Sequence, residues 1–319
     1  MKKKSLEISI VLPVFNEQNN LEQLYLELVE VLKKMSIKDY EIIFVNDGSM
    51  DNSLELVKEF SHKNKNVKYI DLSRNFGQQI AISAGIEKSS GRYVVIMDSD
   101  LQDPPEVILD LYSKAKEGFD VVYATRKKRK GESAFKKMSA TAFYRILRSI
   151  TRCNIPVDAG DFRIISSKVA NILNNMPEQQ KFLRGQIAWV GFKQTSIEFD
   201  RDSRKSGKSG YSTARMFSFA IDGITSFSDF PLKLATFLGF FVSIITFILM
   251  LWALYQRLIA QQYVQGWTSL ILSVLFIGGI QLIAIGIIGE YIGRIGSNIR
   301  KRPLYIINDT NLEEEEEKS

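Results

Sequence analysis

The stretch that decides the fold is YVVIMDSD, residues 93–100. Its first five residues, Tyr93 to Met97, are apolar and rich in β-branched side chains, which predicts a buried strand. The strand ends in two carboxylates one residue apart, Asp98 and Asp100. Two such side chains at a strand end can face one hard cation, so the stretch predicts a Mg²⁺ or Mn²⁺ site at one edge of a sheet.

Short apolar strands alternate with helices on both sides of this stretch. We expect strands at 8–14, 41–45, 67–72 and 120–124, and helices at 18–34, 53–62, 79–88 and 106–116. This alternation predicts an α/β domain with a mostly parallel, Rossmann-like sheet. Ligands of such sheets bind at the carboxyl ends of the strands. The residues to inspect are therefore 13–17, 46–49, 73–77 and 98–100.

Two common nucleotide-binding loops are missing from these positions. No G-x-G-x-x-G follows the first strand, which argues against a dinucleotide-binding unit. Gly207-Lys208-Ser209 resembles the end of a P-loop, but Asp202 stands where the earlier glycine is required. Any nucleotide should therefore be bound by a different set of loops.

The composition limits the metal chemistry and suggests the charge of the partner. The chain has 319 residues, one histidine (His62) and one cysteine (Cys153), which exclude an internal disulfide and the usual His/Cys zinc site. The soluble part is expected in a reducing compartment. The net charge of +6 favours an anionic partner: nucleic acid, anionic lipid or a phosphorylated substrate. Nucleic acid is disfavoured because the basic residues are not interleaved with an aromatic platform.

Two uncharged apolar runs near the C-terminus predict membrane spans. Leu234–Leu254 and Trp267–Gly289 are about 21 and 23 residues long, enough to cross a hydrocarbon core. The alternative is two buried core helices. Lys233 precedes the first run and Arg294, Arg300, Lys301 and Arg302 follow the second. The positive-inside tendency then puts both chain ends in the cytoplasm of a multi-pass plasma membrane protein.

We expect four regions along the chain. Residues 1–211 form the cytoplasmic α/β domain, and residues 212–231 form interfacial amphipathic helices, for which a core helix is the alternative. Residues 232–290 form two transmembrane helices, and residues 291–319 a cytoplasmic basic segment with an acidic tail. No signal peptide is expected, since Lys2–Lys4 lead straight into the first strand.

Four segments together resemble a known family. IVLPVFNE (10–17), NDGS (46–49), RNFG (74–77) and MDSDLQD (97–103) are similar to the GT-A glycosyltransferases of family 2, and most of all to the polyprenyl-phosphate glycosyltransferases. The resemblance covers nearly the whole chain. It implies a GT-A catalytic domain followed by interfacial and transmembrane helices. It also implies metal-dependent, inverting transfer of a sugar, glucose from UDP-glucose, to undecaprenyl phosphate.

The resemblance also implies roles for individual residues. The nucleotide would be bound by Pro13, Phe15, Glu17, Asp47, Asp98 and Gln102. The metal would be held by Asp98 and Asp100. The acceptor phosphate would be bound by Arg126, Arg129, Lys137, Arg163, Arg204 and Ser209. The catalytic residues would be Asp161, Asp158 and Asp100. Gly210 stands where the family has a lysine, so the phosphate contact of that lysine has no direct counterpart.

Acceptor chemistry independently favours arginines over a strong base. A phosphate monoester has its second pKa at about 6, so it is largely a dianion at neutral pH. It needs orientation and charge control more than deprotonation, and guanidinium groups supply both. Asp161 is the preferred acid/base candidate. The alternative is that it caps a turn or pairs with Arg163.

Other functions remain open at this stage. Mannosyl or other glycosyl transfer to the same lipid would need only a few pocket changes. A processive polysaccharide synthase shares the nucleotide half but carries a Q-x-x-R-W stretch, which Arg184-Gly185-Gln186 does not supply. A noncatalytic membrane adaptor that binds nucleotide sugars is the third alternative. Small residues in the second span, such as Gly278 and Gly279, would allow a homo-oligomer.

Overall fold

The computed structural model describes residues 6–126, 159–199, 230–258 and 266–312. These residues fall into two compact units. One holds the described residues up to 199 together with residues 302–312, and the other holds the two long helices between them. Of the predicted regions, the interfacial segment 212–231 lies outside the described residues up to residue 229, and the acidic run 313–317 lies wholly outside them.

The first unit is built on an eight-stranded sheet in the order β7-β5-β6-β4-β1-β2-β3-β8. Its strands are β1 (Leu6–Val14), β2 (Tyr40–Asn46), β3 (Val67–Leu72), β4 (Gly91–Ile96), β5 (Val121–Arg126), β6 (Ala159–Ser166), β7 (Gln194–Phe199) and β8 (Ile307–Thr310). β1 is parallel to β2 and β4, β2 to β3, and β5 to β7. β6 runs antiparallel between β4 and β5, and β8 antiparallel beside β3. The predicted mostly parallel α/β sheet is confirmed.

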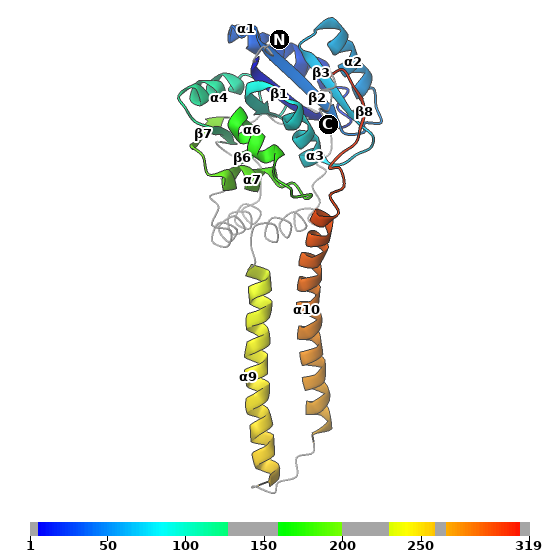
Figure 1. The fold of residues 1–319 in the computed structure, drawn as a ribbon, viewed down its shortest axis with the longest axis vertical. Helices are drawn as coiled ribbons and strands as arrows, with labels where there is room; N and C mark the ends of the chain where they lie inside the picture. The colour runs from blue at the N-terminus through cyan, green and yellow to red at the C-terminus, as the bar shows by residue number, and fades with distance from the viewer. Residues whose placement is uncertain (1–5, 127–158, 200–229, 259–265, 313–319) are drawn as a thin grey trace. The chain divides into compact units, whose positions relative to one another are not determined.

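Helices cover both faces of this sheet (Figure 1). They are α1 (Leu21–Lys34), α2 (Ser53–Lys63), α3 (Gln78–Lys88), α4 (Val107–Lys116), α6 (Ser167–Asn174) and α7 (Leu183–Val190). Adjacent strand residues supply different cores: Ile10 and Leu12 pack with α1, α2 and α4, whereas Val11 packs with α3, α6 and α7. The central strands are therefore apolar on both faces, which explains their continuous hydrophobic runs.

A buried polar cluster closes the amino end of the sheet. Glu41, at the start of β2, is 4% exposed and accepts hydrogen bonds from the Ser9 hydroxyl at 2.6 Å and the Ser90 amide at 2.7 Å. The Ser9 hydroxyl accepts in turn from the Gly91 amide at 2.8 Å. A Cβ on Gly91 would lie 2.5 Å from the Ser9 amide nitrogen, so this close approach of β4 to β1 requires glycine.

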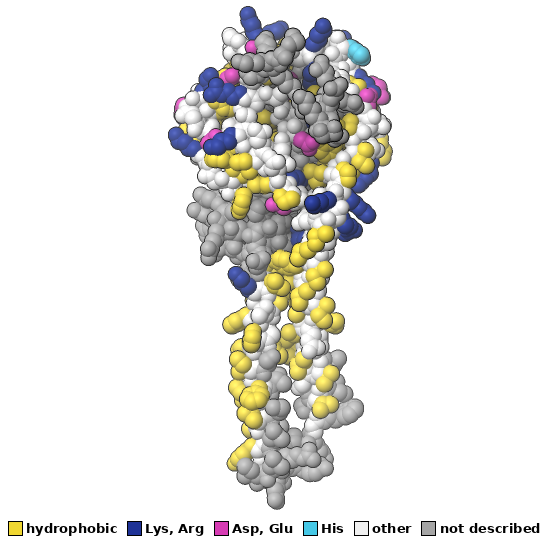
Figure 2. All heavy atoms as spheres, in the orientation of Figure 1, with side chains coloured by type: hydrophobic (Ala, Val, Ile, Leu, Met, Phe, Trp, Pro, Cys, Tyr) yellow, Lys and Arg dark blue, Asp and Glu magenta, His cyan; other side chains and the backbone are white. Residues whose placement is uncertain are grey.

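The second unit consists of α9 (Phe230–Leu258) and α10 (Trp267–Ile299), which contact each other. Pro231–Leu249 and Phe276–Ile299 have mean hydropathies of 2.2 and 1.6, and neither stretch is buried. Hydrophobic side chains lie along both helices in Figure 2. By length and composition both helices can cross a membrane.

Candidate functional site

The loops after β1 and β2 are held together by side-chain hydrogen bonds. The Asn16 backbone amide donates to the Ser49 hydroxyl at 3.0 Å, and the Met50 backbone amide donates to the side-chain Oδ1 of Asn16 at 2.8 Å. The Glu17 amide donates to the Ser53 hydroxyl at 2.9 Å. Asn16 has φ 57°, a left-handed conformation that asparagine tolerates better than most residues. The two loops are thus joined to each other; Phe15 in the first is 45% exposed, whereas Asp47 in the second is 3% exposed.

Asp47 fastens the end of β2 to the start of α3. Its two carboxylate oxygens accept from the backbone amides of Phe76 at 2.7 Å and Gly77 at 2.9 Å. Burial raises the pKa of Asp47, and these two amide bonds oppose that rise. The following Gly48 has φ +70°, and a Cβ there would lie 2.7 Å from the Asn75 nitrogen, so glycine is required. Each Asp47 oxygen keeps a second lone pair that can accept a further hydrogen bond. The contact of Asp47 with the nucleotide stays a prediction.

Asp98, Ser99 and Asp100 follow β4, as expected from the sequence. The Ser99 hydroxyl donates to the Pro13 carbonyl at 2.7 Å, which ties this segment to the loop after β1. The Gln78 side-chain amide donates to Asp98 Oδ1 at 2.7 Å, and the Gln102 amide donates to Asp100 Oδ1 at 3.1 Å. The structure therefore brings the segment that carries Asp98, Asp100 and Gln102 next to the loop after β1, one of the two predicted to bind nucleotide.

The charge around Asp98 suits a cation. Desolvation, together with repulsion by Asp161, Asp103 and Asp100, raises the pKa of Asp98 to about 7. A bound cation would relieve this repulsion, and Asp98 and Asp100 offer the hard oxygen ligands that Mg²⁺ and Mn²⁺ take. Across the described ranges, no three His, Cys, Asp or Glu side chains gather as a ready cation site. Two carboxylates fit an ion whose remaining positions are taken by water and substrate phosphate oxygens.

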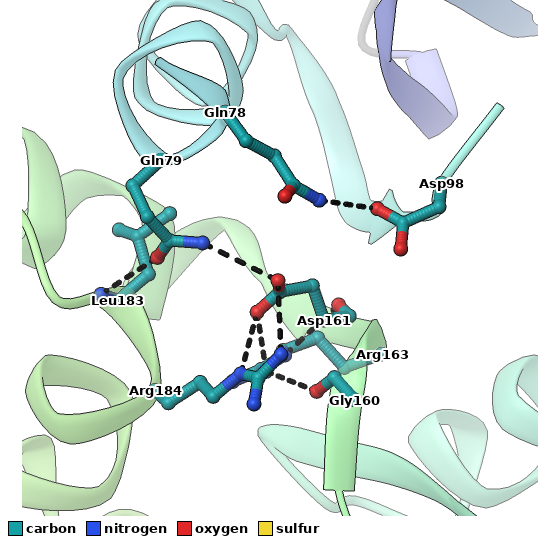
Figure 3. Close-up of polar contacts among 8 residues, drawn as sticks. All are labelled: Gln78, Gln79, Asp98, Gly160, Asp161, Arg163, Leu183 and Arg184. Atoms are coloured by element: carbon teal, nitrogen blue, oxygen red, sulfur yellow. Dashed lines mark hydrogen bonds and ion pairs between the residues drawn. The ribbon is translucent and has the colours of Figure 1, made fainter. Parts of the chain in front are cut away.

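Asp161, on β6, is held by two arginines (Figure 3). Arg184 Nε and Nη2 donate to its two oxygens at 2.9 and 3.2 Å, and Gln79 Nε2 donates at 3.3 Å. Arg163 Nη2 lies 3.4 Å from Asp161 Oδ1, so the pairing considered from the sequence is present. Burial would raise the pKa of Asp161, but Arg184 and Arg163 outweigh it and lower that pKa to about 2. Asp161 is therefore ionised at neutral pH.

Arg163 is a buried partner of Asp161. It is 1% exposed, donates to the carbonyls of Asp161 and Gly160 at 3.1 and 2.6 Å, and lies 5.2 Å from the Tyr123 ring centroid. Its Nη1 finds no hydrogen-bond partner in the part of the chain that the structure describes. The predicted contact of Arg163 with an acceptor phosphate stays a prediction.

Several predicted acceptor and catalytic residues lie outside the description. Arg126 ends β5, but its side chain is not described. The residues wholly outside the described ranges are Asp158, Arg129, Lys137, Arg204 and Ser209. The structure thus assembles the predicted nucleotide and metal residues with Asp161, and leaves the predicted acceptor set largely undescribed.

Sequence reasoning missed Gln78, Gln79 and Arg184. The two glutamines open α3 directly after the RNFG segment, immediately beyond the strand-end positions 73–77 that the sequence singles out. Gln79 also accepts from the Leu183 amide at 3.2 Å, so it joins α3, α7 and Asp161. Arg184 was weighed only as part of a synthase motif. Its position in α7, far along the chain from Asp161, carries no local signal of the pairing.

Comparison with known proteins gives consistent results. The family model described as glycosyl transferase family 2 matches residues 9–173. An uncharacterized glycosyltransferase of Bacillus subtilis is 47% identical over 95% of this chain and 94% of its own length. One of Synechocystis is 43% identical over 96% of each chain. A prophage-derived bactoprenol glucosyl transferase of Shigella flexneri is 37% identical over 96% of this chain and 99% of its own length.

Proposed function

This chain belongs to glycosyltransferase family 2, and we propose that it transfers glucose from UDP-glucose to the phosphate of undecaprenyl phosphate. One observation carries the proposal. The likeness to a bactoprenol glucosyl transferase covers 96% of this chain, so it must include most of α9 and α10 as well as the catalytic unit. A soluble acceptor would not account for a likeness that extends along both apolar helices.

On the donor side, the loops after β1 and β2 would bind the nucleotide, and Asp98 and Asp100 would hold a divalent cation. The cation would neutralise charge on the departing diphosphate. Gln78 holds Asp98 through its 2.7 Å hydrogen bond, and Ser99 holds the segment against Pro13. These bonds orient the two carboxylates before substrate arrives, which lowers the cost of binding.

The displacement itself would be a single inverting step. A phosphate oxygen of the lipid forms a bond to the anomeric carbon while the bond from that carbon to the UDP oxygen breaks, and UDP leaves with the bonding electrons. The acceptor is already largely a dianion, so no strong base is required. Retention of the anomeric configuration in the product would contradict this step.

We infer that Asp161 is better suited to positioning a neighbouring group than to acid/base catalysis. A carboxylate with a pKa of about 2 has no proton to donate at neutral pH and accepts one poorly. Its two bonds with Arg184 instead fix that guanidinium beside the site. We therefore assign Asp161 to the orientation of Arg184, with Asp158 and Asp100 retained as the other catalytic candidates.

The connectivity supports a multi-pass arrangement with both chain ends in the cytoplasm. The chain leaves the catalytic unit before α9 and returns to it in β8 after α10. Two crossings by these helices bring the chain back to the side it left. The basic residues next to the helices favour the cytoplasm for that side. The four-region division and a homo-oligomer stay predictions.

The test is sugar transfer by the full-length protein in liposomes that contain undecaprenyl phosphate. UDP-glucose, GDP-mannose and UDP-N-acetylglucosamine are supplied in turn, with Mg²⁺ or with EDTA. We expect metal-dependent label in the lipid from UDP-glucose. Label from GDP-mannose alone would favour mannosyl transfer, a polymer would favour a synthase, and binding without turnover would favour an adaptor.

Asp100→Asn tests the metal assignment in the same assay. We expect transfer to be abolished even in saturating Mg²⁺, since one of two carboxylate ligands is lost. Asp110→Asn, which removes an exposed carboxylate on α4, is the matched control and should transfer normally. Near-normal turnover by Asp100→Asn would overturn the assignment.

A further inference from the structure

Strand β8 is contributed by the chain after α10. It pairs with β3, which would be the edge strand without it, and places Asp71 opposite Asp309 and Leu72 opposite Ile307. Two residues of β8 therefore advance for one residue of β3, which makes Asn308 the extra residue of a bulge. Bulges re-aim side chains. Figure 1 shows β8 running along this edge of the sheet.

The bulged Asn308 begins a chain of hydrogen bonds that leads toward the proposed nucleotide site. Its side-chain amide donates to Asp71 Oδ2 at 2.8 Å, and the Asn46 side-chain amide donates to Asp71 Oδ1 at 2.7 Å. Asn46 Oδ1 accepts from the Ser49 amide at 3.3 Å. Asp71 and Asn46 are 5% and 3% exposed, so water competes little for these bonds. We call Asn308, Asp71 and Asn46 the relay.

The relay ends on the turn that carries the nucleotide contacts. Asn46 closes β2, and residues 46–49 interlock with Asn16 of the neighbouring loop through Ser49. A shift of Asn46 would therefore move both loops together. Asp71 needs both donors, because the loss of either one would leave a buried carboxylate oxygen without a hydrogen bond, which costs free energy.

The fastening of β8 does not depend on the relay alone. Asp309 forms an ion pair with Lys58 at 2.6 Å, and the Tyr69 amide donates to Asn311 Oδ1 at 2.8 Å. These contacts attach the strand without reaching the loops. A role for Asn308 in attachment can thus be separated from a role in positioning.

We propose that Asn308 is a positioning residue for the donor nucleotide, acting through Asp71 and Asn46 on the turn 46–49. This rests on the proposed function, since it takes that turn as part of the nucleotide site. Binding of the nucleoside diphosphate then depends on correct pairing of the C-terminal strand. The segment that leaves the second apolar helix is thereby part of the donor site's support.

The test uses the full-length protein with three variants. Asn308→Asp places two carboxylates against each other. The double variant Asn308→Asp with Asp71→Asn restores both bonds with their directions kept at Asn46, because residue 71 then accepts from Asn46 and donates to residue 308. Asp309→Asn is the control on the same strand. UDP binding by calorimetry, the KM for each substrate and the thermal midpoint are measured for all.

We expect Asn308→Asp to weaken UDP binding and raise the donor KM about tenfold, the loss of one charge-assisted bond. We expect kcat and the KM for the lipid to remain within about twofold of the wild-type values. The double variant should recover most of the binding, and Asp309→Asn should match wild type. If Asn308→Asp does not fold, Asn308→Ser should raise the donor KM about threefold, because its shorter side chain leaves a weaker bond.

Wild-type UDP affinity in a folded Asn308 variant would overturn the inference. A lower thermal midpoint with an unchanged donor KM, which a purely structural role predicts, would do the same. Failure of the double variant to recover binding would also overturn it. Wild-type protein that binds no UDP and no UDP-sugar would instead contradict the proposed function. The two failures are therefore distinguishable.

Discussion

At the amino end of the sheet, Glu41 is enclosed by the neutral donors Ser9 and Ser90, whereas at the carboxyl end Asp98 and Asp161 lie among other charges. Asp98 is repelled by three carboxylates, and Asp161 is held by two arginines. The first arrangement is complete without a ligand. The second leaves Asp98 with repulsion from neighbouring carboxylates that a bound cation would relieve. Burial of an acid alone therefore does not mark a site, but its unbalanced charge does.

Asp98→Asn gives the sharpest contrast between the two ends. We expect kcat to fall about 10³-fold, since a metal ligand is lost, while repulsion from Asp161, Asp103 and Asp100 is relieved. The thermal midpoint should be unchanged or higher. Single-turnover transfer and thermal unfolding measure the two effects. A loss of stability as large as the one expected for Glu41→Ala, described next, would contradict this contrast.

Glu41→Ala should show the opposite pattern. It leaves the Ser9 hydroxyl and the Ser90 amide without their acceptor, which should lower the free energy of unfolding by about 3 kcal/mol. Transfer per folded molecule should be retained. Denaturant unfolding and transfer normalised to folded protein measure this. A selective loss of kcat in folded protein would show that the amino end also serves the reaction.

Arg184→Met should have the smallest effect of the three. The variant loses the guanidinium that Asp161 orients through two bonds, whereas Asp161 itself keeps Arg163 and Gln79. We expect kcat/KM to fall about 30-fold, near 2 kcal/mol. Arg184→Lys should recover little, since an ammonium cannot make the paired bonds of a guanidinium. Full activity of the lysine variant would show that charge alone matters at this position.

Much of the sheet could be predicted because its signals are local. Strand 67–72 matches β3, and the predicted helix 79–88 begins one residue after α3 does. The strand ends then located Asp47, Asp98 and Asp100, since parallel strands bring their carboxyl ends to one edge. The hydrophobic periodicity and the turn residues were sufficient to predict these elements.

Long-range pairing could not be predicted in the same way. β8 has four residues, Ile307 to Thr310, and follows a basic segment, so nothing local distinguishes it from a tail. Asp161 and Arg184 are joined across β6 and α7, and their contact depends on how α7 packs. Gln79 was missed for the same reason, because its partners are distant in the chain. These contacts are products of tertiary structure.

The return of the chain to β3 has a consequence for how the protein is made. The helical hairpin is an insertion within the catalytic unit, so the sheet cannot be completed until the ribosome has passed both apolar helices. Until then β3 is an open edge, which invites pairing with other chains. Pairing of β8 with β3 can therefore occur only after both apolar helices have been synthesised, and a chain cut short after α10 would leave β3 as an exposed edge strand.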